Sequence, residues 1–391
     1  MNSQARLITP RFVLVVTSGL FYFLALAMLT PVIPHYVEDQ MGEGSVAVGI
    51  AVGAFALGAI VLRTVMGKVG DIIGRRILII GGALVVAGST LVYGVIQALW
   101  WLVLMRIVTG FGEAAFFVGA ATMITDLSPP HRRGEAVSYW SVAVYGGLSF
   151  GPALGEFLRG HDRYTLCWTV SGLLALTAAI LGCFTREVPR ETHDKRSTHL
   201  FHRAALGPGM VLFLGLIPLA GFSAFMPLYA DDVLHISSGG VFILYGVLIL
   251  FVRILGARIP DNLGGKRAGS LATAFAAIGI AIVALWPTIG GLILGTIVFA
   301  VGMSLMYPAL LLLALTGVSD ADRASVVGTF SSFFDASQGV GAFICGAVVA
   351  VVGSDRGAFA AGAVTAALGL LLLRRQPERK TATHPDEALP A

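Results

Sequence analysis

The stretch GKVGDIIGRR, residues 67–76, separates two apolar runs and has a counterpart 190 residues further along the chain. The same shift places Arg63 on Arg253 and Gly112 on Gly302. Two generic apolar helices would have no reason to share such landmarks. Further pairs at this spacing are Lys68 and Arg258, Asp71 and Asp261, Gly74 and Gly264, Arg133 and Arg323, and Gly151 and Gly341. The chain is therefore predicted to contain two related halves.

The composition indicates that lipid solvates most of this chain. Of 391 residues, 56% are hydrophobic and 12% are charged, whereas soluble domains usually carry about 25% charged residues. The mean hydropathy is +0.85. Long apolar runs recur along the whole sequence, so the excess does not belong to one large core. The basic residues are placed as membrane topology requires, and the net charge of +4 therefore does not call for a nucleic-acid partner.

About twelve runs are long enough to cross a hydrocarbon layer of roughly 30 Å. They cover residues 12–34, 46–66, 77–97, 100–124, 136–158, 164–185, 205–230, 238–258, 268–286, 289–315, 324–352 and 357–373. The predicted fold is an all-α membrane protein with twelve transmembrane helices in two pseudo-symmetric six-helix bundles. The expected segments are an N-terminal bundle (1–185), a cytoplasmic linker (186–204), a C-terminal bundle (205–373) and a cytoplasmic tail (374–391).

The distribution of basic residues predicts the orientation. With both termini in the cytoplasm, 20 of the 26 Lys and Arg residues fall in cytoplasmic segments and three in external loops. The remaining three lie inside predicted helices: Arg63, Arg106 and Arg253. Arg63 and Arg253 come near the inner helix ends, where we expect their side chains to snorkel to the membrane surface. The expected location is the cytoplasmic (inner) membrane.

The stretch 67–76 resembles the loop pattern G-x-L-x-D-R-x-G-R-R of the major facilitator superfamily, and the resemblance extends over essentially all twelve predicted helices. It implies a gating loop that bridges the halves in the outward-facing state. Ile72 stands where the family usually has an arginine, and the alternative role is a simple topology anchor. The residues assigned to this loop are Gly67, Asp71, Gly74, Arg75, Arg76 and Asp261.

A second motif, RIVTGFGE at residues 106–113, resembles the buried arginine and glycines of the fourth helix in this family. Arg106 and Glu113 are seven residues apart, about two helical turns, and so share roughly one helix face. The resemblance implies that Arg106 tunes a proton site, with Glu113 a candidate for that site or for substrate contact. The alternative is a buried ion pair that fixes helix packing.

The third motif, GLSFGPALGE at residues 147–156, resembles the G-x-x-x-G-P-x-x-G-G pattern of antiporter subfamilies. Glycines spaced four apart let helices approach closely, and a proline bends a helix. Glu156 replaces the last glycine of the pattern, and packing alone is the alternative use. The antiporter-type residues are Gly147, Gly151, Pro152 and Gly155.

Asp335 lies in the middle of the predicted eleventh helix, where Tyr145 is its counterpart in the repeat. An intramembrane carboxylate can take and release a proton as its surroundings alternate between dry and wet. Asp335 is therefore a candidate proton or substrate site, and a hydrogen-bonded packing residue is the alternative. Tyr36, Phe116 and Tyr145 are candidates to line a substrate cavity, although each could also pack against its neighbours.

The energy source is expected to be the proton gradient, because no Gly-x-x-x-x-Gly-Lys-Ser/Thr loop for ATP occurs in the sequence. We expect no cofactor and no metal site. The three cysteines have no metal-site spacing, and we expect them to be buried in apolar runs.

These features predict a secondary transporter, most closely a drug:proton antiporter of the kind that confers multidrug resistance. It would export small amphipathic drugs or metabolites by alternating access between its halves. Its partners would be the small-molecule substrate, protons and the lipid bilayer, and a monomer is the family default. The alternatives are an exporter or importer of polar solutes such as sugars or metallophores, and a non-transporting membrane sensor. An enzyme is not expected, because no clustered catalytic set is present.

Overall fold

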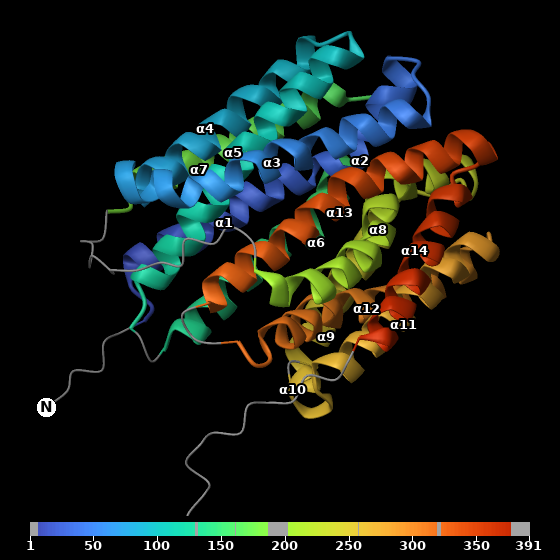
Figure 1. Cartoon of the computed structure of the whole chain (residues 1–391). Coiled ribbons are helices and arrows are strands. Elements are labelled where there is room, and N and C mark those ends of the chain that lie inside the picture. The colour runs from blue at the N-terminus through green and yellow to red at the C-terminus, as the bar shows by residue number, and fades with distance from the viewer. Residues whose placement is uncertain are drawn as a thin grey trace, which may run out of the picture.

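The computed structural model describes residues 7–129, 132–160, 162–186, 202–256, 258–318 and 322–376, which form helices joined by short turns (Figure 1). The first group of elements is α1 (Pro10–Ala27), α2 (Leu29–His35), the π-helical turn η1 (Tyr36–Gln40), α3 (Ser45–Ile73), α4 (Arg75–Val92), the 3-10 turn η2 (Tyr93–Val95), α5 (Leu99–Asp126), α6 (Arg133–Arg159) and α7 (Tyr164–Cys183). The second group is α8 (Arg203–Asp232), α9 (Gly239–Leu255), α10 (Ile259–Leu263), α11 (Gly265–Leu285), α12 (Ile289–Leu315), α13 (Arg323–Val352) and α14 (Arg356–Arg375). The all-helical prediction is confirmed.

Ten helical segments of the described chain are long and apolar enough to cross a membrane. The other two predicted crossings correspond to α6 and α9. The first carries charged residues at both ends, and the second is an apolar helix of 17 residues. Both lie between the two groups of helices, where protein covers part of their surface.

Most helices match the predicted runs, and the main differences come from proline and glycine. The first predicted run is divided into α1 and α2 at Met28, because Pro31 has no N–H to donate back to the preceding turn. The eighth run ends at Leu255 instead of 258, where Gly256 and then Pro260 separate α9 from α10. Its counterpart α3 has no proline and continues unbroken to Ile73.

The repeated loop has the same backbone conformation in both halves. Gly74 has φ of 102° and Gly264 has φ of 78°, and each residue ends one helix and precedes the next. A residue with a Cβ atom rarely adopts such angles, so glycine is required at both positions. The sequence repeat is therefore also a structural repeat.

The helices pack as two groups, α1 to α7 and α8 to α14, which Figure 1 shows in blue to green and in yellow-green to red. The groups meet mainly along two helix pairs, α3 with α13 and α6 with α9, and α2 also packs against α8. We call these contacts the α3–α13 seam and the α6–α9 seam. The second group begins at Arg203 and ends at Arg375, each two residues beyond the predicted bundle. Residues 187–201 of the predicted linker and 377–391 of the predicted tail lie outside the described residues.

The expectation that all three cysteines are buried is wrong for one of them. Cys167 and Cys345 are buried, whereas Cys183 is exposed because it is the last residue of α7.

Candidate functional site

Arg63 lies inside the α3–α13 seam, where its side chain contacts one carboxylate from each half. The prediction ended this helix at residue 66, but α3 continues to Ile73. Arg63 is therefore ten residues from the end of the helix, about 15 Å along its axis. The apolar span of this helix ends at Arg63, so the residue lies near the inner end of the span as expected, and its side chain turns to carboxylates between the halves.

Two carboxylates from different halves flank this guanidinium. The Nη2 of Arg63 donates to Oε2 of Glu113 on α5 at 2.6 Å, and Nε lies 3.2 Å from Oδ2 of Asp335 on α13. Each carboxylate side chain is 8% exposed, and the Arg63 side chain is 21% exposed. The contact with Glu113 is a hydrogen-bonded ion pair, whereas Nε and Oδ2 are not aligned for a hydrogen bond. The ion pair that crosses between the halves is thus the weaker of the two.

Aromatic side chains enclose the same network on the side of the first half. The guanidinium of Arg63 lies 4.8 Å from the ring centroid of Phe117. Tyr22 of α1 stacks on Phe116 with ring centroids 3.7 Å apart, and its buried hydroxyl has no hydrogen-bond partner among the described residues. The ring of Phe117 covers part of the Arg63 guanidinium and shields its interaction with Glu113 from water on that side.

Arg106 does not form the ion pair with Glu113 that their spacing allows. Its Nε donates to the carbonyl oxygen of Ala51 at 3.0 Å, and its Nη2 donates to that of Val52 at 3.4 Å. The guanidinium also lies 4.9 Å from the ring centroid of Phe55. All of these partners belong to α3, and no carboxylate of the described residues pairs with Arg106. The side chain therefore connects α5 to α3 within the first half.

The three candidate cavity residues lie in different surroundings. Tyr36 donates its hydroxyl to the carbonyl oxygen of Ile96 at 2.6 Å, within the first half. Phe116 is fully buried in the core of that half. Tyr145 of α6 lies in the α6–α9 seam, with the Cζ of Arg253 3.8 Å from its ring centroid. Of the three, Tyr145 is the one placed between the two groups of helices.

The predicted gating loop connects the ends of several helices. The Nε of Arg75 lies 2.7 Å from Oδ2 of Asp126 at the end of α5, and Arg76 donates to the carbonyl oxygen of Cys183 at 2.5 Å. The side chains of Asp71 and Asp261 lie outside the described side chains. The described contacts of Arg75 and Arg76 thus fix the loop to the first half.

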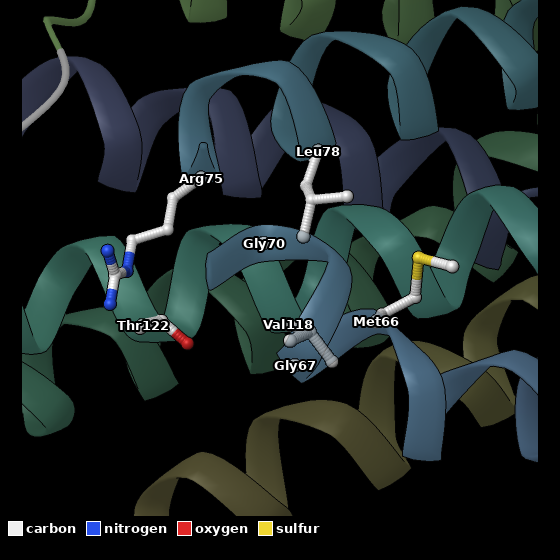
Figure 2. Close-up of a pocket in the computed structure, with 7 residues that line it drawn as sticks. All are labelled: Met66, Gly67, Gly70, Arg75, Leu78, Val118 and Thr122. Atoms are coloured by element: carbon white, nitrogen blue, oxygen red, sulfur yellow. The ribbon is translucent and has the colours of Figure 1, made fainter. Parts of the chain in front are cut away.

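A small pocket lies next to this loop (Figure 2). It is lined by Met66, Gly67, Gly70, Arg75, Leu78, Val118 and Thr122. Its volume of about 20 Å³ has room for a water molecule, far below the roughly 300 Å³ of a small ligand pocket. The pocket is therefore too small for a transported molecule.

The antiporter-type glycines of α6 lie against the first helical run. A Cβ atom on Gly147 would lie 2.7 Å from the backbone nitrogen of Leu24, and one on Gly151 would lie 2.5 Å from the Cβ of Ala27. A Cβ atom on Gly155 would collide with the carbonyl oxygen of Met28. The motif thus permits close backbone contact between α6 and the junction of α1 and α2.

We expect Gly155→Ala to lower the melting temperature of the purified protein by several degrees, because the new methyl group cannot fit without separating these helices. Gly88→Ala is the matched control, since a Cβ atom at this α4 position meets no atom within 4 Å. The measurement is thermal unfolding in detergent. Equal melting temperatures for the two variants would contradict the close contact.

Near the predicted external end of the bundle, a second group of charged side chains connects the halves. Arg159 of α6 contacts Glu156 at 3.2 Å and Asp231 of α8 at 3.7 Å. Close by, Asp39 accepts a hydrogen bond from the hydroxyl of Tyr164 at 2.9 Å. Glu156 and Arg159 are buried, whereas the side chain of Asp231 is 56% exposed. A half-exposed ion pair of this kind is worth about 0–1 kcal/mol.

The backbones of α3 and α13 also approach closely between this end and the Arg63–Asp335 pair. A Cβ atom on Gly49 would lie 2.6 Å from the carbonyl oxygen of Ala342, and one on Gly53 would lie 2.6 Å from that of Gly339. The two halves are therefore in contact at the predicted external end.

We expect Arg159→Gln to make this end open more often, because the variant removes the Asp231 contact and leaves Glu156 buried without its cation. The readout is the rate at which a maleimide modifies Gly239→Cys, next to Glu156, in a background without the native cysteines. A rise of about fivefold corresponds to about 1 kcal/mol. Arg163→Gln, an exposed arginine near the same end, is the control. An unchanged rate in Arg159→Gln would show that the contact does not hold the end closed.

Arg63 was not among the predicted site residues, and neither was the charged group around Arg159. The signal for Arg63 was available, since it is one of the charged positions that both halves retain. The contact between Arg159 and Asp231 could not be predicted from the repeat, because it arises only when the two halves pack.

Comparisons with known proteins agree with this architecture. The family model described as the Major Facilitator Superfamily matches residues 15–342. An uncharacterized MFS-type transporter of Salmonella typhimurium is 28% identical over 370 residues, which cover 90% of this chain and 94% of the relative. An uncharacterized MFS-type transporter of Burkholderia mallei is 25% identical, over 93% of this chain and 91% of the relative.

Solved structures of transporters share the fold. A bacterial homolog of the human lysosomal transporter Spinster, in an inward-facing and occupied conformation, has a TM-score of 0.73 and 19% identity, over 93% of this chain and 94% of that one. A mutant form of the nucleoside transporter NupG has a TM-score of 0.75 and 13% identity, over 93% and 99% of the two chains. The human organic anion transporter MFSD10 has a TM-score of 0.70 and 19% identity, over 94% and 100%.

The repeated six-helix architecture, the motif-bearing loop and the extent of these matches lead to one assignment. This chain is a membrane transporter that belongs to the major facilitator superfamily.

Proposed function

We propose that the protein is a proton-coupled secondary transporter in which Arg63, Glu113 and Asp335 form the coupling site. The observation that carries this proposal is one arginine held between two buried carboxylates, one from each half. A charge inside the membrane is costly and is usually associated with function. A charged network that crosses between the moving halves can couple protonation to their movement.

The two ion pairs of Arg63 suggest different roles for the carboxylates. Glu113 forms the tight hydrogen-bonded pair within the first half, so it keeps the guanidinium compensated throughout the cycle. A proton on Asp335 would remove the charge that attracts Arg63 across the seam. The α3–α13 seam can then loosen without leaving an unpaired arginine, and loss of the proton restores the contact.

The other motifs have supporting roles in this proposal. Arg106 positions α5, and hence Glu113, through its bonds to backbone carbonyl groups of α3. The loop residues 67–76 latch the halves in the outward-facing state, and the α6 glycines provide the contact on which that helix moves. Both termini are cytoplasmic, and the working unit is a monomer in the inner membrane.

The direction we propose is export of a small amphipathic drug or metabolite in exchange for protons. The support is the antiporter-type motif in α6, whose glycines pack against α1 and α2. The alternative is uptake of a polar solute. The direction in which the pH inside the vesicles changes when substrate is added distinguishes export from uptake.

The test uses everted membrane vesicles that contain the protein and an imposed pH gradient. A panel of amphipathic anions, amphipathic cations and sugars is added in turn, and the gradient is followed with a pH-sensitive dye. We expect one class of compound to dissipate the gradient in vesicles with the wild-type protein and not in vesicles without it. Transport of a labelled compound without any proton movement would contradict proton coupling.

A further inference from the structure

Arg253 of α9 is the counterpart of Arg63 in the repeat, but its surroundings differ. Arg63 has two carboxylate partners, whereas no carboxylate of the described residues lies within ion-pairing distance of Arg253. Its contact is the ring of Tyr145, 3.8 Å from Cζ. The repeat explains the difference, because Tyr145 and Met303 occupy the positions that correspond to Asp335 and Glu113. The α6–α9 seam thus has the arginine without either acid.

A guanidinium in this position needs a negative partner. Arginine stays charged in proteins, so Arg253, which is half-buried with its Nε fully covered, cannot avoid the cost of this burial by losing its proton. Its cation–π contact compensates the charge less than an ion pair would in a dry environment. Tyr145 lies 12 residues from the start of α6, about 18 Å along the helix, and the side chain of Arg253 reaches its ring from the last turn of α9. The described residues do not supply the missing charge.

Hydrogen-bond donors lie beside this guanidinium. The Nε of Arg253 is buried without a hydrogen-bond partner, and the hydroxyl groups of Tyr145 and Tyr245 have none among the described residues. Tyr245, also on α9, is close enough to interact electrostatically with both Arg253 and Tyr145. Its ring stacks on Phe299 with centroids 5.7 Å apart, which fixes its position. Donors without partners surrounded by aromatic rings suit a ligand with an anionic group on an apolar body.

We propose that Arg253 binds an anionic group of the transported molecule, such as a carboxylate, sulfonate or phosphate attached to an apolar or aromatic body. The group would be held between Arg253 of α9 and Tyr145 of α6, with Tyr245 as a further hydrogen-bond donor. This inference rests on the proposed function, because it names the class of molecule that the transporter carries. Each side of the site belongs to a different half, so movement of the halves would assemble and separate it.

The test is a fluorescence titration of the protein in nanodiscs of neutral lipid, with empty nanodiscs as the blank. The probes share a dansyl ring and differ in charge: dansylglycine is anionic, dansylamide is neutral and dansylcadaverine is cationic. We expect dansylglycine to bind about tenfold more tightly than dansylamide, a difference of about 1.4 kcal/mol, and dansylcadaverine to bind most weakly. Arg253→Gln should reduce the ratio to about one, and Arg253→Lys should retain part of it. Arg258→Gln, an exposed arginine near the end of the same helix, should bind as the wild type does.

Three results would overturn the inference. The first is equal binding of dansylglycine and dansylamide by the folded wild-type protein, and the second is a preference that survives Arg253→Gln. The third is the loss of dansylglycine binding when phosphatidylglycerol is added to the discs, which would assign the site to a lipid headgroup. Should Arg253→Gln not fold, the charge series on the wild type and Arg253→Lys still decide the question.

The titration also separates this inference from proton coupling, because it is done at equilibrium without a pH gradient. Asp335→Asn is expected to keep the preference for dansylglycine while losing proton-driven transport. A transporter that prefers the anion but moves no protons would contradict the proposed coupling and leave the Arg253 site intact.

Discussion

Asp335→Asn is expected to lower substrate-dependent proton movement in everted vesicles by about a hundredfold, the scale of losing a proton-transfer group. The amide cannot bind and release a proton, and it carries no charge to attract Arg63 across the α3–α13 seam. Asp335→Glu retains a carboxylate and should recover part of the rate. The readout is the initial rate of fluorescence change of a pH-sensitive dye when substrate is added.

Two variants complete this experiment. Asp355→Asn removes a carboxylate of the same half that precedes α14 and lies outside the predicted spans, and it should transport as the wild type does. Glu113→Gln should reduce transport less than Asp335→Asn, because Glu113 pairs with Arg63 within one half. A wild-type rate of proton movement in Asp335→Asn would show that Asp335 is not the coupling residue. Glu113 would then be the remaining candidate of the two carboxylates.

Arg63→Met is expected to be the most destabilising single substitution in the site, with a cost of about 3 kcal/mol in unfolding free energy. The change leaves Glu113 and Asp335 buried near each other without the cation between them. Arg253→Met is the matched control, since that arginine has no carboxylate partner among the described residues and loses a cation–π contact worth about 1 kcal/mol. Thermal unfolding in detergent at neutral pH measures both.

A double variant tests whether the carboxylates cause this cost. Arg63→Met combined with Glu113→Gln should be more stable than Arg63→Met alone, because the second change removes one of the two uncompensated charges. An equal loss of unfolding free energy in Arg63→Met and Arg253→Met would show that the ion pairs of Arg63 stabilise the protein no more than the ring contact of Arg253 does.

Much of the fold could be predicted because the thickness of a bilayer sets the length of the apolar runs. The sequence repeat predicted the division into two halves. The positive φ angles of both Gly74 and Gly264 agree with the correspondence of the two loops in the sequence. Helix ends were harder to predict. The second run was predicted to end at residue 66, before the polar residue Lys68, yet the helix continues to Ile73.

The composition of the site could be predicted only in part. Glu113 and Asp335 were both singled out as intramembrane carboxylates, but their common partner was not, because sequence spacing carries no information on how one half packs against the other. Spacing also favoured Arg106 as the neighbour of Glu113. In the structure, carbonyl groups of α3 accept hydrogen bonds from that arginine instead.

The measurement that tests the coupling site most directly compares two activities of Asp335→Asn in proteoliposomes. One is exchange of labelled for unlabelled substrate at equal pH, which needs alternating access but no net proton movement. The other is accumulation of substrate driven by a pH gradient. We expect exchange within about twofold of the wild-type rate and no driven accumulation, because Asp335 would couple the proton without being needed for the movement of the halves. Driven accumulation at the wild-type level would contradict this role of Asp335.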